Sequence, residues 1–195
     1  MIVLALNSGS SSFKFGLYRV EASRAEELLS DTIPASSAEE ALAGVVKLLA
    51  RSNVPAPAAI GHRLVHGGPT LRQHCLIDAS VIQQLEAAVA LAPLHMPTAL
   101  TFIRFAQERF PGLPQVACFD TSFHAGLPDV ARVLPIPREL QLEGIQRYGF
   151  HGLSVESILH HLGPDVPDRV VIAHLGNGAS VTAVKGGQSI DTAWD

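Results

Sequence analysis

The chain has 195 residues, of which 47% are hydrophobic and 16% are charged, and its formal net charge is −4. This length allows one large domain or one and a half ordinary ones, and the hydrophobic content supports a substantial core and argues against disorder. The negative charge argues against a nucleic-acid partner that is held by phosphate neutralisation. Two cysteines, Cys75 and Cys118, are too few for a disulfide scaffold, so a reduced, cytoplasmic protein is expected.

The N-terminus predicts neither a signal peptide nor a membrane anchor. It enters an apolar strand at once and lacks a basic region. No stretch reaches the roughly 18 apolar residues that a membrane-spanning helix needs. We therefore expect a soluble protein without a membrane partner.

Three consecutive strands are predicted at the start of the chain, over Ile2–Leu6, Phe13–Val20 and about Glu27–Ile33. The turn between the first two, Asn7 to Ser12, consists of small polar residues whose backbone N–H groups and hydroxyls can converge on an anionic oxygen. It is not a P-loop, because no Gly-Lys-Ser/Thr opens a helix. A tight hairpin without a ligand is the simpler explanation of this turn by itself.

Helices and further strands follow. Ser36-Ser37-Ala38-Glu39 resembles a capping box at the start of a helix that ends near Arg51. The later elements are a strand over Ala58–Val65, helices over Ser80–Leu91 and Pro97–Phe110, and a short strand over Gln115–Phe119. This order predicts an antiparallel meander extended by parallel crossovers, that is, an α/β module with a mixed sheet and flanking helices.

The last part of the chain has the same element order as the first. A helix is predicted over Leu153–Leu162, and strands over Arg169–His174, Val181–Lys185 and, for its start, Gln188–Ile190. A Gly/Ser turn again joins the first two strands, which indicates an internal repeat. A lone meander buries little apolar surface, so we expect an incomplete second copy in a sequence that is cut short.

Arg63 ends a predicted buried strand, and open α/β sheets hold ligands at this end of their strands. Its planar guanidinium suits a carboxylate or a phosphate, and a structural ion pair is the alternative. His62 and His66 are four residues apart, which suggests zinc. That spacing binds a metal on a helix, however, and these residues lie on a strand and its turn.

Three further side chains are candidates for chemistry. His95 lies in a loop bracketed by prolines, Asp120 ends a buried strand, and His151 stands between two glycines before a helix. Their plainer explanations are a solvated loop histidine, a cap of the next turn and an ordinary helix start. With Arg63 and two Gly/Ser turns they suit phosphoryl transfer with Mg²⁺. Acyl transfer by a triad is not favoured, because no serine lies in a G-x-S-x-G pattern.

Six blocks of the sequence resemble the acetokinase family and occur in the order seen in its members. The blocks run from Asn7 to Lys14, Gly61 to Gly68, Ala92 to His95, Phe119 to His124, Arg147 to Gly152 and His174 to Ser180. The resemblance implies a ribonuclease H-like fold of the actin-like ATPase superfamily, with two duplicated domains around a nucleotide cleft. Residues 1–123 would form the acyl-substrate-binding domain, and residues 124–195 the incomplete start of the nucleotide-binding domain.

The resemblance implies an acetate kinase-like reaction, in which ATP phosphorylates acetate to acetyl phosphate by in-line transfer, and it implies roles for particular residues. Asn7 would help to hold Mg²⁺, and Arg63 would bind the carboxylate or the transferring phosphoryl group. His95 and His151 would contact the phosphoryl group, and Asp120 would position the acyl substrate. Fixed guanidinium and imidazole groups offset charge on the equatorial oxygens in such a reaction.

The resemblance also implies two binding surfaces. The acyl pocket would consist of Val65, Leu94 and Phe150, whose apolar walls limit the length of the acyl chain. The ATP phosphates would be bound by Ser10, Ser12, Lys14, His174, Gly176, Asn177 and Gly178. The implied partners are acetate or another short-chain carboxylate, ATP and ADP, and full-length members would form homodimers.

The sequence departs from the family pattern in several places. It ends before the second arginine, the adenosine pocket and the metal-sharing glutamate that the resemblance implies. Its last five residues begin like the family's Asp-Thr-Ser-Met-Gly and then diverge, and Leu153 and Val155 replace a Thr and a His. We therefore expect little turnover by this chain alone. The alternatives are a propionate or butyrate kinase, or a catalytically silent fragment that only binds a partner or dimerises.

Overall fold

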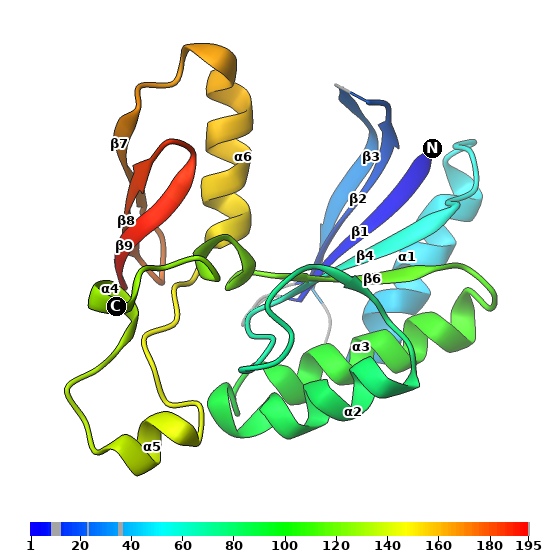
Figure 1. Cartoon of the computed structure of the whole chain (residues 1–195). Coiled ribbons are helices and arrows are strands. Elements are labelled where there is room, and N and C mark those ends of the chain that lie inside the picture. The colour runs from blue at the N-terminus through cyan, green and yellow to red at the C-terminus, as the bar shows by residue number, and fades with distance from the viewer. Residues whose placement is uncertain (9–12, 23, 35–36, 195) are drawn as a thin grey trace. The chain divides into compact units, whose positions relative to one another are not determined.

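The computed structural model describes residues 1–8, 13–22, 24–34 and 37–194 (Figure 1). The chain forms two compact units. Unit 1 contains Met1–Leu64 and His74–Cys118, and unit 2 contains Val65–Gln73 and Phe119–Asp195. Each unit is described by itself below.

Unit 1 is built on a six-stranded mixed sheet with the strand order β3-β2-β1-β4-β6-β5. Its strands are β1 (Ile2–Ser8), β2 (Phe13–Val20), β3 (Ala25–Ile33), β4 (Ala59–Leu64), β5 (Cys75–Leu76) and β6 (Gln115–Phe119). β1 pairs antiparallel with β2 and β2 with β3, whereas β1 pairs parallel with β4. The predicted mixed sheet with a meander and a parallel crossover is therefore confirmed.

The α-helices that the structure describes in unit 1 are α1 (Ala38–Arg51), α2 (Ala79–Ala87) and α3 (Met96–Arg109) (Figure 1). The Ser37 side chain accepts a hydrogen bond from the backbone N–H of Glu40 at 3.2 Å. The helix thus begins in the predicted segment, with Ser37 as its cap, one residue after the start of the predicted Ser36–Glu39 box, and Ser36 lies outside the described residues. The single helix predicted over Ser80–Leu91 is wrong in one respect, because the structure ends α2 at Ala87 and continues as a 3₁₀ helix, Ala88–Leu91. The Ala88 N–H is shared between two preceding carbonyls, as is common where a helix tightens at its end.

The core of unit 1 lies between one face of the sheet and helices α1 and α3. Alternate residues of β1 and β2 enter this core, and the ring of Phe13 stacks on Phe102 of α3 at 4.4 Å. The buried residues are Leu4, Leu6, Phe13, Phe15, Leu17, Ala38, Ala41, Leu42, Val45, Ile60, Phe102 and Ala106. Because strand side chains alternate between faces, the residues between these strand positions point to the opposite face.

Unit 2 contains a three-stranded antiparallel sheet and short helices. The sheet has the order β7-β8-β9, with β7 (Arg169–His174), β8 (Ser180–Lys185) and β9 (Gln188–Trp194). The helices are α4 (Asp129–Arg132), α5 (Arg138–Leu142), α6 (Gly152–Leu162) and the 3₁₀ helices Ser122–His124 and Gly163–Asp165. Val155 of α6 packs against Ile172 and Val184 on one face of this sheet.

The two meanders share details of their pairing, as the predicted repeat implies. In each, the second and third strands change register, between Leu17 and Tyr18 in β2–β3 and between Ala183 and Val184 in β8–β9. Gly186 and Gly187 both have positive φ, 55° and 76°, which a two-residue turn between β8 and β9 requires. Among the described residues, no helix is long and apolar enough to cross a membrane.

Candidate active site

Three of the predicted site residues form a row across the sheet of unit 1. Asn7 on β1 is opposite Lys14 on β2 and opposite Arg63 on β4. Nη1 of Arg63 donates a hydrogen bond to Oδ1 of Asn7 at 3.3 Å. Because directly opposite residues share a face of the sheet, two cations flank one amide, and this row favours an anionic ligand.

The residue that precedes Arg63 in β4 is the buried His62. His62, which precedes Arg63, is 2% exposed, and its Nε2–H donates to Oε1 of Gln115 at 2.7 Å. Burial lowers the pKa of His62 to about 4, although the hydrogen bond to Gln115 acts in the opposite direction. His62 is therefore a neutral core residue that joins β4 to Gln115. The described residues include no group of three or more His, Cys, Asp or Glu side chains that could hold a metal ion.

A second group of predicted site residues surrounds the N-terminus of α6 in unit 2. His151 is the N-cap residue of α6 and has a left-handed backbone, with φ 58° and ψ 22°. The next backbone N–H, of Gly152, donates to the carbonyl oxygen of Asp120 at 2.8 Å. A Cβ at position 152 would lie 2.4 Å from that oxygen, so only glycine allows this approach. The buried Asp120, 2% exposed, is thus joined to the first turn of α6.

Two imidazoles stack beside this helix end. The rings of His151 and His174 are 4.2 Å apart and 18° from parallel. Nδ1 of His151 is 3.0 Å from the Ser180 hydroxyl, and Nδ1 of His174 is 2.9 Å from the Ser154 hydroxyl. The dipole of α6 favours negative charge at this end, where the N–H groups of Gly152 and Ser154 already donate to the carbonyl oxygens of Asp120 and His151. The pair and the helix end together therefore have the chemistry of an oxyanion site.

His124 supports the segment that precedes His151. Its Nε2–H donates to the carbonyl of Phe150 at 3.1 Å, and its Nδ1 accepts from the hydroxyl of Ser189 at 2.9 Å. Burial lowers the pKa of His124, which keeps the ring neutral. A Cβ at Gly149 would lie 2.2 Å from this ring. That His124 supports this segment was not predicted from the sequence. The signal for it was Gly149, a glycine between the aromatic residues Tyr148 and Phe150, which leaves room for a neighbouring ring.

The residues predicted for the acyl pocket are divided between the units. In unit 2, Val65 precedes His66. The ring centroids of His66 and Phe150 are 5.7 Å apart, and those of Phe150 and Trp194 are 4.7 Å apart. In unit 1, Leu94 is 85% exposed.

The remaining predicted residues are placed as follows. His95, in unit 1, is the exposed N-cap residue of α3 and makes no side-chain cap. Gly176, Asn177 and Gly178 lie in the turn between β7 and β8, beside His174. Ser10 and Ser12 lie outside the described residues. The structure thus brings together Asn7, Lys14 and Arg63 in unit 1, and Asp120, His151 and His174 in unit 2.

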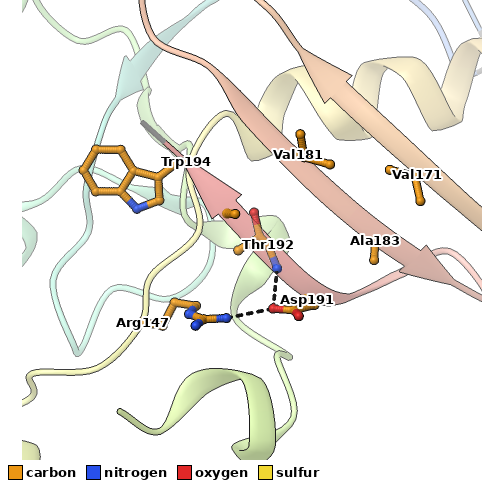
Figure 2. A pocket seen from close by; sticks show the side chains of 8 residues that line it. Arg147, Val171, Val181, Ala183, Asp191, Thr192 and Trp194 are labelled. Carbon is orange, nitrogen blue, oxygen red and sulfur yellow. Dashed lines mark hydrogen bonds and ion pairs between the residues drawn. The ribbon is translucent and has the colours of Figure 1, made fainter. Parts of the chain in front are cut away.

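A hollow of about 520 Å³ lies on the other face of the β7-β8-β9 sheet (Figure 2). Figure 2 shows Arg147 and Asp191 pointing toward each other at its edge, with Nη1 of Arg147 2.8 Å from Oδ1 of Asp191. Its walls are formed by Arg147, Val171, Val181, Ala183, Asp191, Thr192, Ala193 and Trp194. None of the predicted site residues that the structure describes lines this hollow.

Acetate kinases and a propionate kinase are among the known proteins with similar sequences and structures. The family model described as the acetokinase family matches residues 23–194. An acetate kinase of Nitrobacter hamburgensis is 42% identical over an alignment of 222 positions, gaps included, which covers 97% of this chain and 55% of that protein. An acetate kinase 2 of Neisseria meningitidis is 48% identical over 69% of this chain and 35% of that protein.

The structural neighbours agree with the sequence relatives. A propionate kinase from Francisella tularensis superposes with a TM-score of 0.83 and 35% identity, over 98% of this chain and 56% of that one. An acetate kinase from Porphyromonas gingivalis superposes with a TM-score of 0.80 and 29% identity, over 98% of this chain and 56% of that one. The chain spans about half the length of the relatives that it matches. The chain belongs to the acetokinase family.

Proposed function

We propose that this chain carries the acyl-substrate side and the start of the nucleotide side of an acetate kinase-like phosphotransferase. A carboxylate oxygen of acetate attacks the γ-phosphorus of ATP, the bond from that phosphorus to the β,γ-bridging oxygen breaks, and acetyl phosphate and ADP are formed. In this proposal residues 1–123 form the acyl-binding domain and residues 124–195 begin the nucleotide-binding domain. The observation that carries it is the Lys14–Asn7–Arg63 row in a member of the acetokinase family.

Arg63 is the proposed anchor of the carboxylate or the transferring phosphoryl group. Its guanidinium is charged at any physiological pH and offers parallel N–H donors to two oxygens of one anion. The bond to Asn7 restricts its orientation, so the guanidinium is held before the ligand arrives. Preorganised charge of this kind lowers the barrier more than charge that must rearrange during the reaction.

His151 is the proposed donor to the equatorial oxygens of the phosphoryl group, with His95 as a second donor. The support for His151 is its position at the N-terminus of α6, where the helix dipole favours negative charge. Asp120 is proposed to position the acyl substrate, and its carbonyl holds Gly152 at the start of the same helix. The reaction needs little covalent chemistry from the protein beyond such positioning.

ATP is proposed to bind through its phosphates to the two Gly/Ser turns. The residues involved are Ser10, Ser12, Lys14, His174, Gly176, Asn177 and Gly178. Mg²⁺ fits this site only together with ATP, because the row in unit 1 supplies one neutral oxygen, from Asn7, between two cations, and Mg²⁺ usually takes its other ligands from phosphates and water. When bound, the metal would neutralise phosphate charge.

Val65, Leu94 and Phe150 are proposed to form the walls around the acyl chain. An apolar pocket discriminates only modestly between chains that differ by one methylene, by about 1–3 kcal/mol. The Francisella structure is titled as a propionate kinase, so propionate is the second candidate substrate. Initial rates with acetate, propionate and butyrate at equal concentration separate the two.

The proposal is tested by trapping acyl phosphate as the hydroxamate, with purified chain, ATP, Mg²⁺ and acetate. Arg63→Ala is expected to lower the rate at least 100-fold. Arg104→Ala, which removes an exposed arginine paired with Glu86, is the matched control and is expected to leave the rate unchanged. Because turnover by this chain alone is expected to be low, binding of acetyl phosphate is measured in parallel by calorimetry. Equal rates and equal affinities for wild type and Arg63→Ala would contradict the proposal. Light scattering shows whether this chain forms the homodimer that the resemblance implies for full-length members.

A further inference from the structure

We propose that Ser180 is a positioning residue for His151, holding the imidazole so that Nε2 alone is presented to the ligand. This inference rests on the proposed function, in which His151 contacts the phosphoryl group. Ser180 itself touches neither substrate nor cofactor in this scheme. It acts through the histidine.

The position of the Ser180 hydroxyl is fixed by the sheet. Ser180 is paired with His174 on β7 and with Trp194 on β9, so it lies in the middle of a three-residue row across unit 2. It is 2% exposed, and its hydroxyl is 3.0 Å from Nδ1 of His151. Pairing on both sides holds the backbone of Ser180 in place, and the contact with His151 is the described partner of its hydroxyl.

The neighbours in this row hold the His151 segment from two further directions. The ring of His174 stacks on His151 at 4.2 Å, and the ring of Trp194 meets Phe150, the preceding residue, at 4.7 Å. The left-handed backbone at His151 is an uncommon conformation for a residue with a side chain. Such a conformation persists where the surroundings over-determine it, and the row supplies those contacts.

Occupation of Nδ1 determines what the imidazole can do. A neutral imidazole has one N–H donor and one acceptor nitrogen, and a partner at one nitrogen selects the state of the other. The Ser180 hydroxyl lies 3.0 Å from Nδ1. In this proposal it donates to Nδ1, so the ring proton is on Nε2 and is offered to the ligand. Without the Ser180 hydroxyl, the His151 ring can exchange tautomers and rotate. Nε2 then carries the proton only part of the time.

The chain contains its own matched control. His174 is held at Nδ1 by Ser154 of α6 in the same way that His151 is held by Ser180 of β8. The two rings stack on each other, but each has its own serine. A variant of one serine therefore removes one hydroxyl and leaves the other histidine anchored.

The test uses the whole chain, labelled with ¹⁵N, and records the imidazole nitrogens by long-range proton–nitrogen NMR in wild type, Ser180→Ala and Ser154→Ala. In wild type the two His151 nitrogens are expected to differ as in a single tautomer. In Ser180→Ala they are expected to move toward a common averaged shift, and the dissociation constant for inorganic phosphate is expected to rise about tenfold, as for loss of a residue that orients a ligand-binding histidine. In Ser154→Ala the His174 signals should move and those of His151 should stay.

Two results would overturn the inference: tautomer averaging of His151 already in wild type, or identical His151 signals in wild type and Ser180→Ala. Ser180→Thr restores a hydroxyl and is expected to restore the single tautomer. If phosphate and ATP leave the wild-type His151 signals unchanged, the proposed function fails, while the tautomer comparison still decides the role of Ser180. Circular dichroism of each variant identifies one that has lost its fold.

Discussion

Acidification is expected to destabilise unit 1 through the buried His62. This histidine is neutral in the folded chain because burial lowers its pKa from 6.5 to about 4. In the unfolded chain it regains its ordinary pKa and binds a proton earlier as the pH falls. The stability that depends on neutral His62 is therefore full above pH 6.5, falls between pH 6.5 and 4, and levels off below pH 4.

The size of the effect follows from the two pKa values. At pH 5 the unfolded histidine is almost fully protonated and the folded one is almost fully neutral, which costs the folded state about 2 kcal/mol. Oε1 of Gln115 accepts a hydrogen bond from Nε2–H of His62, so a protonated ring would keep this hydrogen bond. The burial of the charged ring would still be uncompensated, so the free-energy cost of protonating His62 in the folded chain remains. His66 in unit 2, whose pKa burial also lowers to about 4, adds a similar contribution in the same pH window.

The measurement is urea unfolding followed by far-UV circular dichroism at pH 7.5 and pH 5, with wild type, His62→Gln and His74→Gln. His74 is an exposed histidine of the same unit. His62→Gln cannot be protonated, so it should lose about 2 kcal/mol less than wild type between the two pH values. His74→Gln should behave as wild type. If wild type and His62→Gln lose the same free energy of unfolding, the assignment of a neutral, buried His62 is wrong.

Three further predictions concern the candidate site. Gly152→Ala should destabilise the chain by about 2–3 kcal/mol, because its Cβ would lie 2.4 Å from the carbonyl of Asp120, whereas Gly126→Ala, which meets nothing within 4 Å, should cost little in the same urea assay. Trp194 is the single tryptophan and is 58% exposed beside Phe150. Its fluorescence should therefore change when acetate or propionate binds, and an unchanged spectrum at saturation by calorimetry would place the acyl group elsewhere. Lys14→Ala should weaken phosphate binding about three- to tenfold and reduce its salt dependence, because it removes one of the two cations of the row, and an affinity equal to wild type at low salt would remove Lys14 from the site.

The sheet of unit 1 could be predicted because its local signals agree with one another. Alternating Phe13, Phe15 and Leu17 indicate a half-buried strand, and α1 begins within the predicted Ser36–Glu39 segment, capped by Ser37. The two-residue strand β5 and the short helices α4 and α5 were not predicted, because four or five residues are too few to show a period. β9 continues to Trp194 because it pairs with β8 along its length, which its own residues do not reveal.

The candidate site was predictable as a set of residue types but not as an arrangement. Arg63 and Asn7 are 56 residues apart, and their contact depends on the parallel register of β1 and β4, which no local pattern specifies. The serine anchors of the two histidines depend in the same way on where β8 and α6 place them. A serine is so common at strand starts and helix starts that its type alone indicates nothing.

The most direct test of the account is a map of where acetyl phosphate binds, made by NMR chemical-shift changes over the whole ¹⁵N-labelled chain. The account predicts that the changes concentrate at two places, the Lys14–Asn7–Arg63 row and the turn around His151 and His174. The changes at the row should disappear in Arg63→Ala. Changes confined to the hollow between Arg147 and Trp194, or spread evenly over the surface, would contradict the claim that these side chains form a phosphoryl-transfer site.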